Sequence, residues 1–253
     1  MAMTDVSLAM GAELQEARIN QSVPLAETIS NGDPLPINYI PMGNIESGFD
    51  SFVMPGVLVL ILHQCIILVS GLSGGAKHED PRMVRYNPVN EAKSVAATMT
   101  GQMLCFFTVL ILPVLFMLHF VPMIFSFPME GKLWQILLFI FPMMVACLGL
   151  GYTLQVFMKE RESVFVIWVV TSVAFLFLSG LTWPRYAIPE GWRWLSYITP
   201  ATWGVEGFIQ MNTNGATLAQ VRTEYVNLWI LAVAYSLAGY CVNRWIMRPR
   251  VNR

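Results

Sequence analysis

The stretch GLTWPRYAIPEGWRWLSYITPATWGVEGF, residues 180–208, places four tryptophans and three prolines between two long apolar runs. The prolines divide it into pieces too short to cross a bilayer, because a spanning helix needs about 20 apolar residues. Tryptophan and tyrosine rings are enriched at membrane–water interfaces, where their apolar body and polar edge are both satisfied. The segments EGWRWLSYI and ATWGVEGFIQM predict two short helices. We therefore expect a short external re-entrant helical hairpin, residues 183–224, at the edge of a membrane.

The rest of the chain has the composition of an integral membrane protein. Of its 253 residues, 55% are hydrophobic and 12% are charged, whereas soluble domains carry about 25% charged residues. The charges gather in short islands, and apolar runs of about 20 residues lie between them. The expected fold is all-α, and the lack of a basic face argues against nucleic-acid binding. Five transmembrane helices are predicted, at residues 52–73, 95–120, 133–158, 164–181 and 225–243.

The basic residues predict the orientation of these spans. Most of the 15 Lys and Arg residues lie in three segments on one side of the predicted membrane, residues 77–93, 159–161 and 244–253. Because cytoplasmic loops carry an excess of Lys and Arg, we expect these segments and the C-terminus to be cytoplasmic. The polar segment 1–50 is then external. A polar external segment of this length without a signal sequence predicts that the chain is a fragment of a longer protein.

Two polar residues, His63 and Gln64, lie in the middle of the first predicted span. Polar side chains at that depth normally face the bundle interior or a water-filled path. We therefore expect them either to line a substrate path or to form hydrogen bonds between helices. In the external hairpin, Trp183, Glu190, Trp203 and Glu206 are candidate residues of an outer gate, and the alternative for the charged ones is a side chain that faces lipid headgroups.

The segment GLSGGAKH, residues 71–78, nearly matches a nucleotide-binding loop. However, Ala76 stands where glycine is needed, and His78 stands where Ser or Thr would hold magnesium. The segment also ends a predicted span. We interpret Gly71 and Gly75 as small residues that allow two helices to pack closely. The chain is therefore expected to bind no cofactor of its own.

Two motifs resemble the permeases of ABC-2 type transporters, in the bacterial exporter group related to drug-efflux permeases. They are MPGVL, residues 54–58, and LSG…WP…IP…W…L…ITPATW, residues 178–203. The resemblance covers nearly the whole chain. It implies six spans per subunit, so the five spans here would be spans two to six. Residues 1–50 would be the remnant of the family's external domain, and residues 51–253 its transmembrane domain.

The resemblance implies a permease subunit that exports a hydrophobic or amphipathic substrate across the bacterial inner membrane. It implies pairing with a second permease subunit, identical or different, and with a separate ABC ATPase that uses ATP and magnesium. A periplasmic adaptor is a further partner that it allows. The charged segment 77–94, between two spans, is then the candidate ATPase-coupling loop, and the alternative is an ordinary solvated loop. Its candidate residues are Lys77, Glu79, Arg82, Arg85, Glu91 and Lys93.

Two other functions are weighed against an ATP-driven exporter. A truncated, non-transporting permease remnant would insert into the membrane and move nothing. An ATP-independent secondary transporter would need ionisable residues at the middle of the membrane for ion coupling. The predicted spans contain no Asp, Glu, Lys or Arg at depth, which counts against the secondary transporter. The residues also form no nucleophile–base set that would indicate an enzyme.

Overall fold

The computed structural model describes residues 49–246, apart from residues 80–94, 128, 159 and 184. The described residues all belong to one compact unit of the chain, Met42–Arg253. They form α-helices with short π-helical and 3-10 turns, and this part of the chain contains no strand. The all-α fold predicted from the apolar runs is confirmed.

Among the described residues, five helices are long and apolar enough to cross a membrane, which agrees with the predicted number of spans. The spanning segments are Val53–Lys77, Val95–Ile124, Leu133–Phe157, Arg161–Leu178 and Arg222–Trp245. The helices that contain them are α2 (Phe49–Glu79), α5 (Val95–Leu115) with η1 (Phe116–Phe120) and α6 (Val121–Ile124), α7 (Leu133–Leu154) with η2 (Gln155–Phe157), α8 (Arg161–Leu178) and α11 (Arg222–Ile246).

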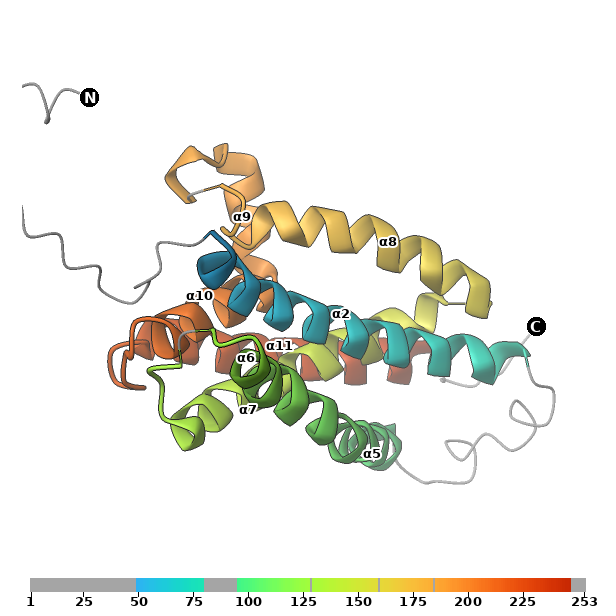
Figure 1. Ribbon diagram of the computed structural model, residues 1–253. Helices are drawn as coiled ribbons and strands as arrows, with labels where there is room; N and C mark the ends of the chain where they lie inside the picture. Colours follow the sequence, from blue (N-terminus) through green and yellow to red (C-terminus); the bar gives the residue numbers. More distant parts are fainter. Residues whose placement is uncertain (1–48, 80–94, 128, 159, 184, 247–253) are drawn as a thin grey trace, which may run out of the picture. The chain divides into compact units, whose positions relative to one another are not determined.

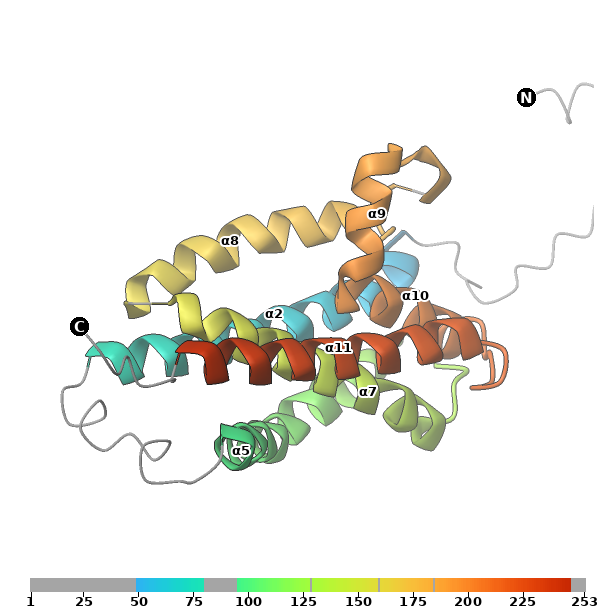
Figure 2. The ribbon, with the colours of Figure 1, turned by 180° about the vertical axis from the view of Figure 1, so that it is seen from behind.

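Helix α2 lies between α8 on one side and α7 and α10 on the other (Figures 1 and 2). Its sequence is apolar on all sides of the helix, which suits a helix surrounded by other apolar elements. Val59, Leu62 and Ile66 are completely buried. Helix α2 is therefore packed mainly against two other spans, α7 and α8, and against the hairpin helix α10.

Much of the apolar surface of the span that begins with α5 is exposed. Leu104 and Leu112 are 68% and 73% exposed, although both are apolar. Pro113 lies inside α5, and a π-helical turn, η1, follows it. Proline lacks an N–H and crowds the carbonyl four residues earlier, so a local change in helical winding near it is expected. The exposed apolar surface suits contact with lipid.

Helices α7 and α11 pack side by side over most of their length. Gly149 makes this approach close, because a Cβ atom on it would lie 3.0 Å from the backbone nitrogen of Ser236. The hydroxyl of Thr153 donates a hydrogen bond to the Gly149 carbonyl at 2.8 Å. Small residues at such contacts let helix backbones come together in a membrane, where apolar burial alone does not hold helices together.

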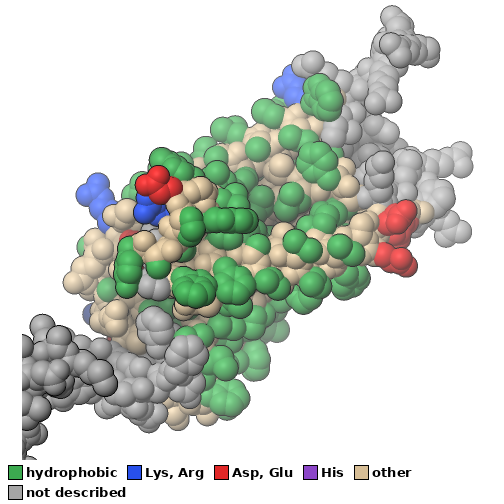
Figure 3. Space-filling view, turned by 90° about the horizontal axis from the view of Figure 1, so that it is seen from above, with side chains coloured by type: hydrophobic (Ala, Val, Ile, Leu, Met, Phe, Trp, Pro, Cys, Tyr) green, Lys and Arg blue, Asp and Glu red, His purple; other side chains and the backbone are tan. Residues whose placement is uncertain are grey.

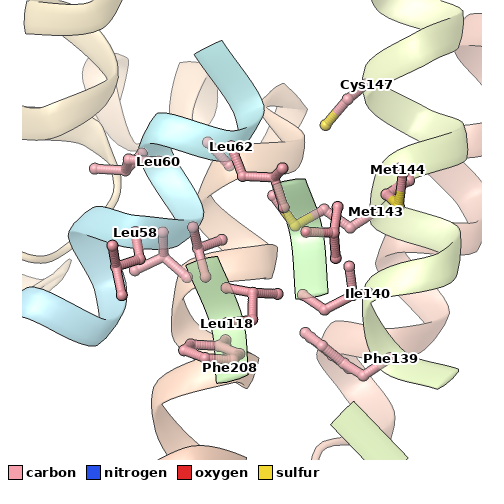
Figure 4. Packing of buried hydrophobic residues seen from close by; sticks show 14 of the residues in the cluster. Leu58, Leu60, Leu62, Leu118, Phe139, Ile140, Met143, Met144, Cys147 and Phe208 are labelled. Atoms are coloured by element: carbon pink, nitrogen blue, oxygen red, sulfur yellow. The ribbon is translucent and has the colours of Figure 1, made fainter. Parts of the chain in front are cut away.

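The main apolar core lies where α2, η1, α7 and α10 meet (Figure 4). Phe139 of α7 and Phe208 of α10 are completely buried in it, together with Leu62 of α2 and Met143 of α7. Leu118 of η1 completes the contact and is 2% exposed. This cluster anchors α10 to the bundle.

The two short helices predicted after α8 are confirmed as α9 (Glu190–Ile198) and α10 (Pro200–Asn212). A 3-10 turn, η3 (Arg185–Ala187), precedes them. Helix α8 ends before Gly180, whose φ of 85° lies in the left-handed region that glycine adopts without strain. Proline at the first position of α10 needs no hydrogen-bond partner for an N–H and suits a helix start.

Charged side chains lie at the two ends of the bundle, and apolar ones cover the surface between them (Figure 3). Among the exposed apolar residues are Val166 and Val170 of α8 and Val233 of α11. A soluble protein would not leave so large an apolar surface uncovered. The distribution is that of side chains in a bilayer, with charges at the headgroups.

Candidate functional site

At the end of the bundle where α2 ends and α8 begins, here called the Glu79 end, a chain of hydrogen bonds joins three spans. Lys77 Nζ donates to Gln102 Oε1 at 2.6 Å, and Gln102 Nε2 donates to Gln155 Oε1 at 2.8 Å. The three residues belong to α2, α5 and η2. Gln155 is 4% exposed, so its bond to Gln102 satisfies a polar group whose burial would otherwise be costly.

The last residue of α2 binds the first residue of α8. Glu79 Oε1 accepts a hydrogen bond from the backbone N–H of Arg161 at 2.6 Å, and Glu79 Oε2 lies 3.0 Å from Arg161 Nε. The N–H groups of a first helical turn have no partner within the helix, and the helix dipole favours a negative charge there. The side chains of Arg161 and Glu79 are 54% and 38% exposed, so the ion pair itself contributes only about 0–1 kcal/mol to stability. Its main effect is to position the two helix ends.

Close packing at the Glu79 end is made by glycines, as predicted for Gly71 and Gly75. A Cβ atom on Gly71 would lie 2.7 Å from Val164 Cγ1, and one on Gly75 would lie 2.8 Å from the backbone nitrogen of Arg161. Helices α2 and α8 therefore approach to backbone contact at this point. The LSGG motif is part of a helix–helix contact and not part of a strand–loop–helix nucleotide site.

Two of the six candidate coupling residues, Lys77 and Glu79, lie in the described part of the chain. They occupy the last turn of α2, directly before the segment that joins α2 to α5. The other four, Arg82, Arg85, Glu91 and Lys93, lie outside the described residues. Their role stays a prediction.

His63 and Gln64 lie in the middle of α2, against α8. The His63 ring is completely buried and packs edge-on against Phe175, with 5.1 Å between ring centroids. Gln64 Oε1 accepts a hydrogen bond from Thr171 Oγ1 at 3.5 Å. Both ring nitrogens of His63, and Gln64 Nε2, are buried without a hydrogen-bond partner among the described residues.

A third polar group in the same seam, Trp168, was not singled out from the sequence. Its indole Nε1 is also buried without a partner in the described part of the chain. Trp168, Thr171 and Phe175 are three and four residues apart, so they share one face of α8, the face turned to α2. This spacing is the sequence signal that could have identified Trp168 as a residue facing α2. Burying polar groups without partners costs free energy, so this seam is less stable than an apolar one would be.

Replacing His63 with leucine is expected to raise the free energy of unfolding by about 1–3 kcal/mol, because it removes a buried polar group that has no partner. Denaturation of the purified chain in detergent measures the change. Gln155→Leu is the matched control, since Gln155 is buried but accepts a hydrogen bond, and it should lower stability. A destabilised His63→Leu protein would mean that His63 has a partner in the membrane.

Trp183 and Glu190, both candidate gate residues, lie near the pocket between the end of α8 and α9. Trp183 is 54% exposed and, with Phe177 and Trp192, lines an apolar pocket of about 490 Å³. Glu190 is exposed at the start of α9, where one carboxylate oxygen lies 3.4 Å from Arg193 Nη2. An exposed pair of this kind contributes little energy.

Trp203 and Glu206 lie on α10. The Trp203 ring stacks on Tyr197, with 5.5 Å between centroids, and its indole N–H donates to the Tyr197 carbonyl at 2.8 Å. The half-buried Glu206 lines a smaller pocket of about 250 Å³, together with Ser179 and Leu181. Trp183, Trp203 and Glu206 each line a different pocket, so the structure does not gather the candidate gate residues into one site.

A bond missed from the sequence ties this hairpin to the last span. Tyr235 Oη, on α11, donates to the carbonyl of Ile198 at the end of α9, at 2.6 Å. A tyrosine in an apolar run gives no local sign of a partner 37 residues earlier.

In the described part of the chain, no three His, Cys, Asp or Glu side chains are placed to hold a metal ion.

Comparison with known proteins identifies the family. The sequence model of a family described as ABC-2 family transporter protein matches residues 2–240, which include four of the apolar helices completely and most of the last one, α11. A comparison with curated proteins finds no match. Members of this family work with an ABC ATPase and form dimers in general. The chain is thus a multi-pass membrane permease that belongs to the ABC-2 family of transporter proteins.

Proposed function

We propose that this chain is the permease subunit of an ATP-driven exporter that moves a hydrophobic or amphipathic substrate outward across the bacterial inner membrane. The observation that best supports the proposal is the set of hydrogen bonds at the Glu79 end, here called the junction. These bonds connect the last turn of α2 to α5, η2 and α8. The basic residues concentrated in the segments at this end favour a cytoplasmic Glu79 end and C-terminus, with the N-terminal segment outside. ATP and magnesium would be bound by a separate ABC ATPase.

The junction suggests how the ATPase would act on the spans. Segment 80–94 joins the end of α2 to the start of α5, so an ATPase bound to it would pull on both helices. Lys77 bonds α2 to Gln102 of α5, and Glu79 bonds α2 to Arg161 of α8. Movement of the segment would therefore reach three spans together. In this proposal Arg82, Arg85, Glu91 and Lys93 contact the ATPase.

The seam between α2 and α8 is the proposed substrate path. The buried donors and acceptors of His63 and Gln64 have no partner in the described part of the chain, so a passing substrate or water could complete their hydrogen bonds. On its side away from the seam, α8 exposes an apolar face that includes Val166, Val170 and Val173. We propose that a second permease subunit, identical or different, covers this face.

The hairpin end is the proposed exit. The pocket beside Trp183, about 490 Å³ in volume, falls within the usual size of small-molecule sites and has an almost entirely apolar lining. This lining supports a hydrophobic or amphipathic substrate. Trp183 would narrow this pocket between transport cycles. Trp203 and Glu206 line two other pockets of the hairpin end and would close the exit there, and Glu190 would face the lipid headgroups.

The proposal is tested by co-expressing the full chain with its ABC ATPase subunit and measuring ATP-dependent uptake of an amphipathic fluorescent dye into inside-out vesicles. Glu79→Arg is expected to lower uptake per ATP hydrolysed at least about fivefold, while stability changes by only about 0–1 kcal/mol. Arg193→Glu is the matched control, because it disrupts a similarly exposed ion pair at the opposite end. Charge reversal at Arg82 and Arg85 should lower both ATPase co-purification and uptake.

Other outcomes discriminate among the alternatives. Uptake that stops when the proton gradient is dissipated at constant ATP would identify a secondary transporter. An inserted, folded chain that moves no dye in the presence of the ATPase would support the non-transporting alternative. Equal loss of coupling in Glu79→Arg and Arg193→Glu would show that the Glu79 end has no special role.

A further inference from the structure

A long apolar groove runs along the outside of the bundle between α5, α7 and α11. Its first part has a volume of about 560 Å³ and is lined by residues of all three helices, among them Ala96, Leu104 and Tyr240. Its second part, about 480 Å³, continues between α5 and α7. Phe107 and Phe141 line both parts and form an edge-on pair, with 5.4 Å between ring centroids.

The groove is open to the surface that the bilayer covers. Leu104 of α5 and Leu237 of α11 form opposite walls of the first part, and they are 68% and 58% exposed. The lining is almost entirely apolar, and the hydroxyl of Thr100 in its wall already donates to the carbonyl of Ala96. A polar solute would therefore find few partners in the groove, whereas a hydrocarbon chain would pack along its whole length.

The length of the first part of the groove, measured along α5, is close to the thickness of the hydrocarbon layer of one leaflet. From Ala96, at the start of α5, to Phe107 is about 16 Å along the helix at about 1.5 Å per residue. Half of the hydrocarbon core of a bilayer is about 15 Å. A chain that entered beside Ala96 and Tyr240 would reach the Phe107–Phe141 pair at the middle of the membrane.

The side chain of Arg244 provides a positive charge at the outer end of the first part of the groove. Arg244 lies one helical turn beyond Tyr240 on α11, and its Nη1 donates a hydrogen bond to the Tyr240 hydroxyl at 2.9 Å. The guanidinium has five N–H donors, and in the described part of the chain no acidic side chain is paired with it. Trp245, the next residue, is 73% exposed, as is usual for tryptophan at the headgroup level.

We infer that this groove binds an anionic glycerophospholipid from the leaflet at the Glu79 end. One acyl chain lies in the groove up to the Phe107–Phe141 pair, and the headgroup phosphate contacts Arg244, whose planar donors match phosphate oxygens. Basic pockets between spans are known places for anionic headgroups. The inference depends on neither the direction of transport nor ATP coupling.

The test is native mass spectrometry of the purified full chain, given equal amounts of phosphatidylglycerol and phosphatidylcholine in detergent and no ATPase. The expected result is one retained phosphatidylglycerol per chain. Arg244→Gln should lower the preference for phosphatidylglycerol about fivefold, the effect expected for one basic residue at a lipid surface. Arg222→Gln, at the opposite end of α11, is the matched control and should leave the preference unchanged.

A second pair of variants tests the groove itself. Val145→Trp would fill its first part, whereas Val233→Trp adds the same side chain to α11, at a position that is 56% exposed and outside the groove lining. Loss of the lipid in Val145→Trp alone supports the inference, and Met103→Trp replaces this variant if it does not fold. Equal retention in Val145→Trp and Val233→Trp, or an unchanged preference in Arg244→Gln, would overturn it. A dimer that Val145→Trp converts to a monomer would also overturn it, because a second copy would then cover the groove.

Discussion

Replacing Gly75 with valine is expected to lower the free energy of unfolding by about 3 kcal/mol or more, the upper range for an overpacked contact. A Cβ atom at Gly75 would lie 2.8 Å from the nitrogen of Arg161 and 2.9 Å from the carbonyl carbon of Glu160. Both are backbone atoms, which cannot move aside as the end of a flexible side chain can. Helices α2 and α8 would have to separate at the Glu79 end.

The same separation would break the contacts that position Glu79. Its carboxylate reaches the first N–H and the side chain of Arg161 only while the two helix ends touch. The substitution should therefore also lower dye uptake per ATP hydrolysed, by at least as much as Glu79→Arg does. Denaturation in detergent measures stability, and the vesicle assay measures coupling.

Gly101→Val is the matched control for this prediction. Gly101 lies in α5, and nothing lies within 4 Å of the position that a Cβ atom would take. Valine has a somewhat higher helix propensity than glycine, so the control should be unchanged or slightly stabilised. If the Gly75→Val and Gly101→Val proteins unfolded at the same denaturant concentration, the close backbone contact assigned to α2 and α8 would be wrong.

Replacing Phe208 with alanine is expected to cost about 3–5 kcal/mol, the usual range for removing a buried aromatic side chain. Phe208 is completely buried where α10 meets α2, η1 and α7 (Figure 4). The cavity left behind loses dispersion contacts on all sides, and this loss does not depend on whether water or lipid surrounds the protein. The hairpin helix α10 would lose its main anchor.

Trp194→Ala is the control for Phe208→Ala. Trp194 is 70% exposed on α9, so its loss removes lipid contacts and few contacts within the protein. Its effect on stability in detergent should stay within about 0.5 kcal/mol, as for other exposed positions. Limited proteolysis between α9 and α11 gives an independent measure, because Phe208→Ala should expose that region and Trp194→Ala should not. Equal sensitivity of the two variants would contradict the assigned role of Phe208.

Features that depend on neighbouring residues in the chain were predictable. Runs of about 20 apolar residues allow few structures in a bilayer other than helices, so the five spans followed from length and hydropathy alone. Prolines at 184, 189 and 200 limited the segment after α8 to short pieces, and α9 and α10 are those pieces. Glycine spacing near the end of α2 correctly predicted a close helix contact.

The candidate residues were predictable as residue types but not as contacts. His63 and Gln64 stood out as polar residues in an apolar run, yet only the packing of α8 on α2 places Trp168 beside the same seam. Arg82, Arg85, Glu91 and Lys93 lie outside the described residues, so their assignment to the coupling loop still rests on charge and family resemblance.

The sequence by itself determined that residues 49–246 form a bundle with five long apolar helices and a Trp-rich hairpin wherever the structure describes them, because helix formation in a membrane depends on local composition. Only the tertiary structure decided which polar groups meet. Gln102 bonds to Gln155, 53 residues away, and Glu79 bonds to Arg161, 82 residues away. The residues next to Gln102 or Glu79 in the chain do not specify these partners. The partners meet only because the helices, with glycines at their contacts, pack closely against each other.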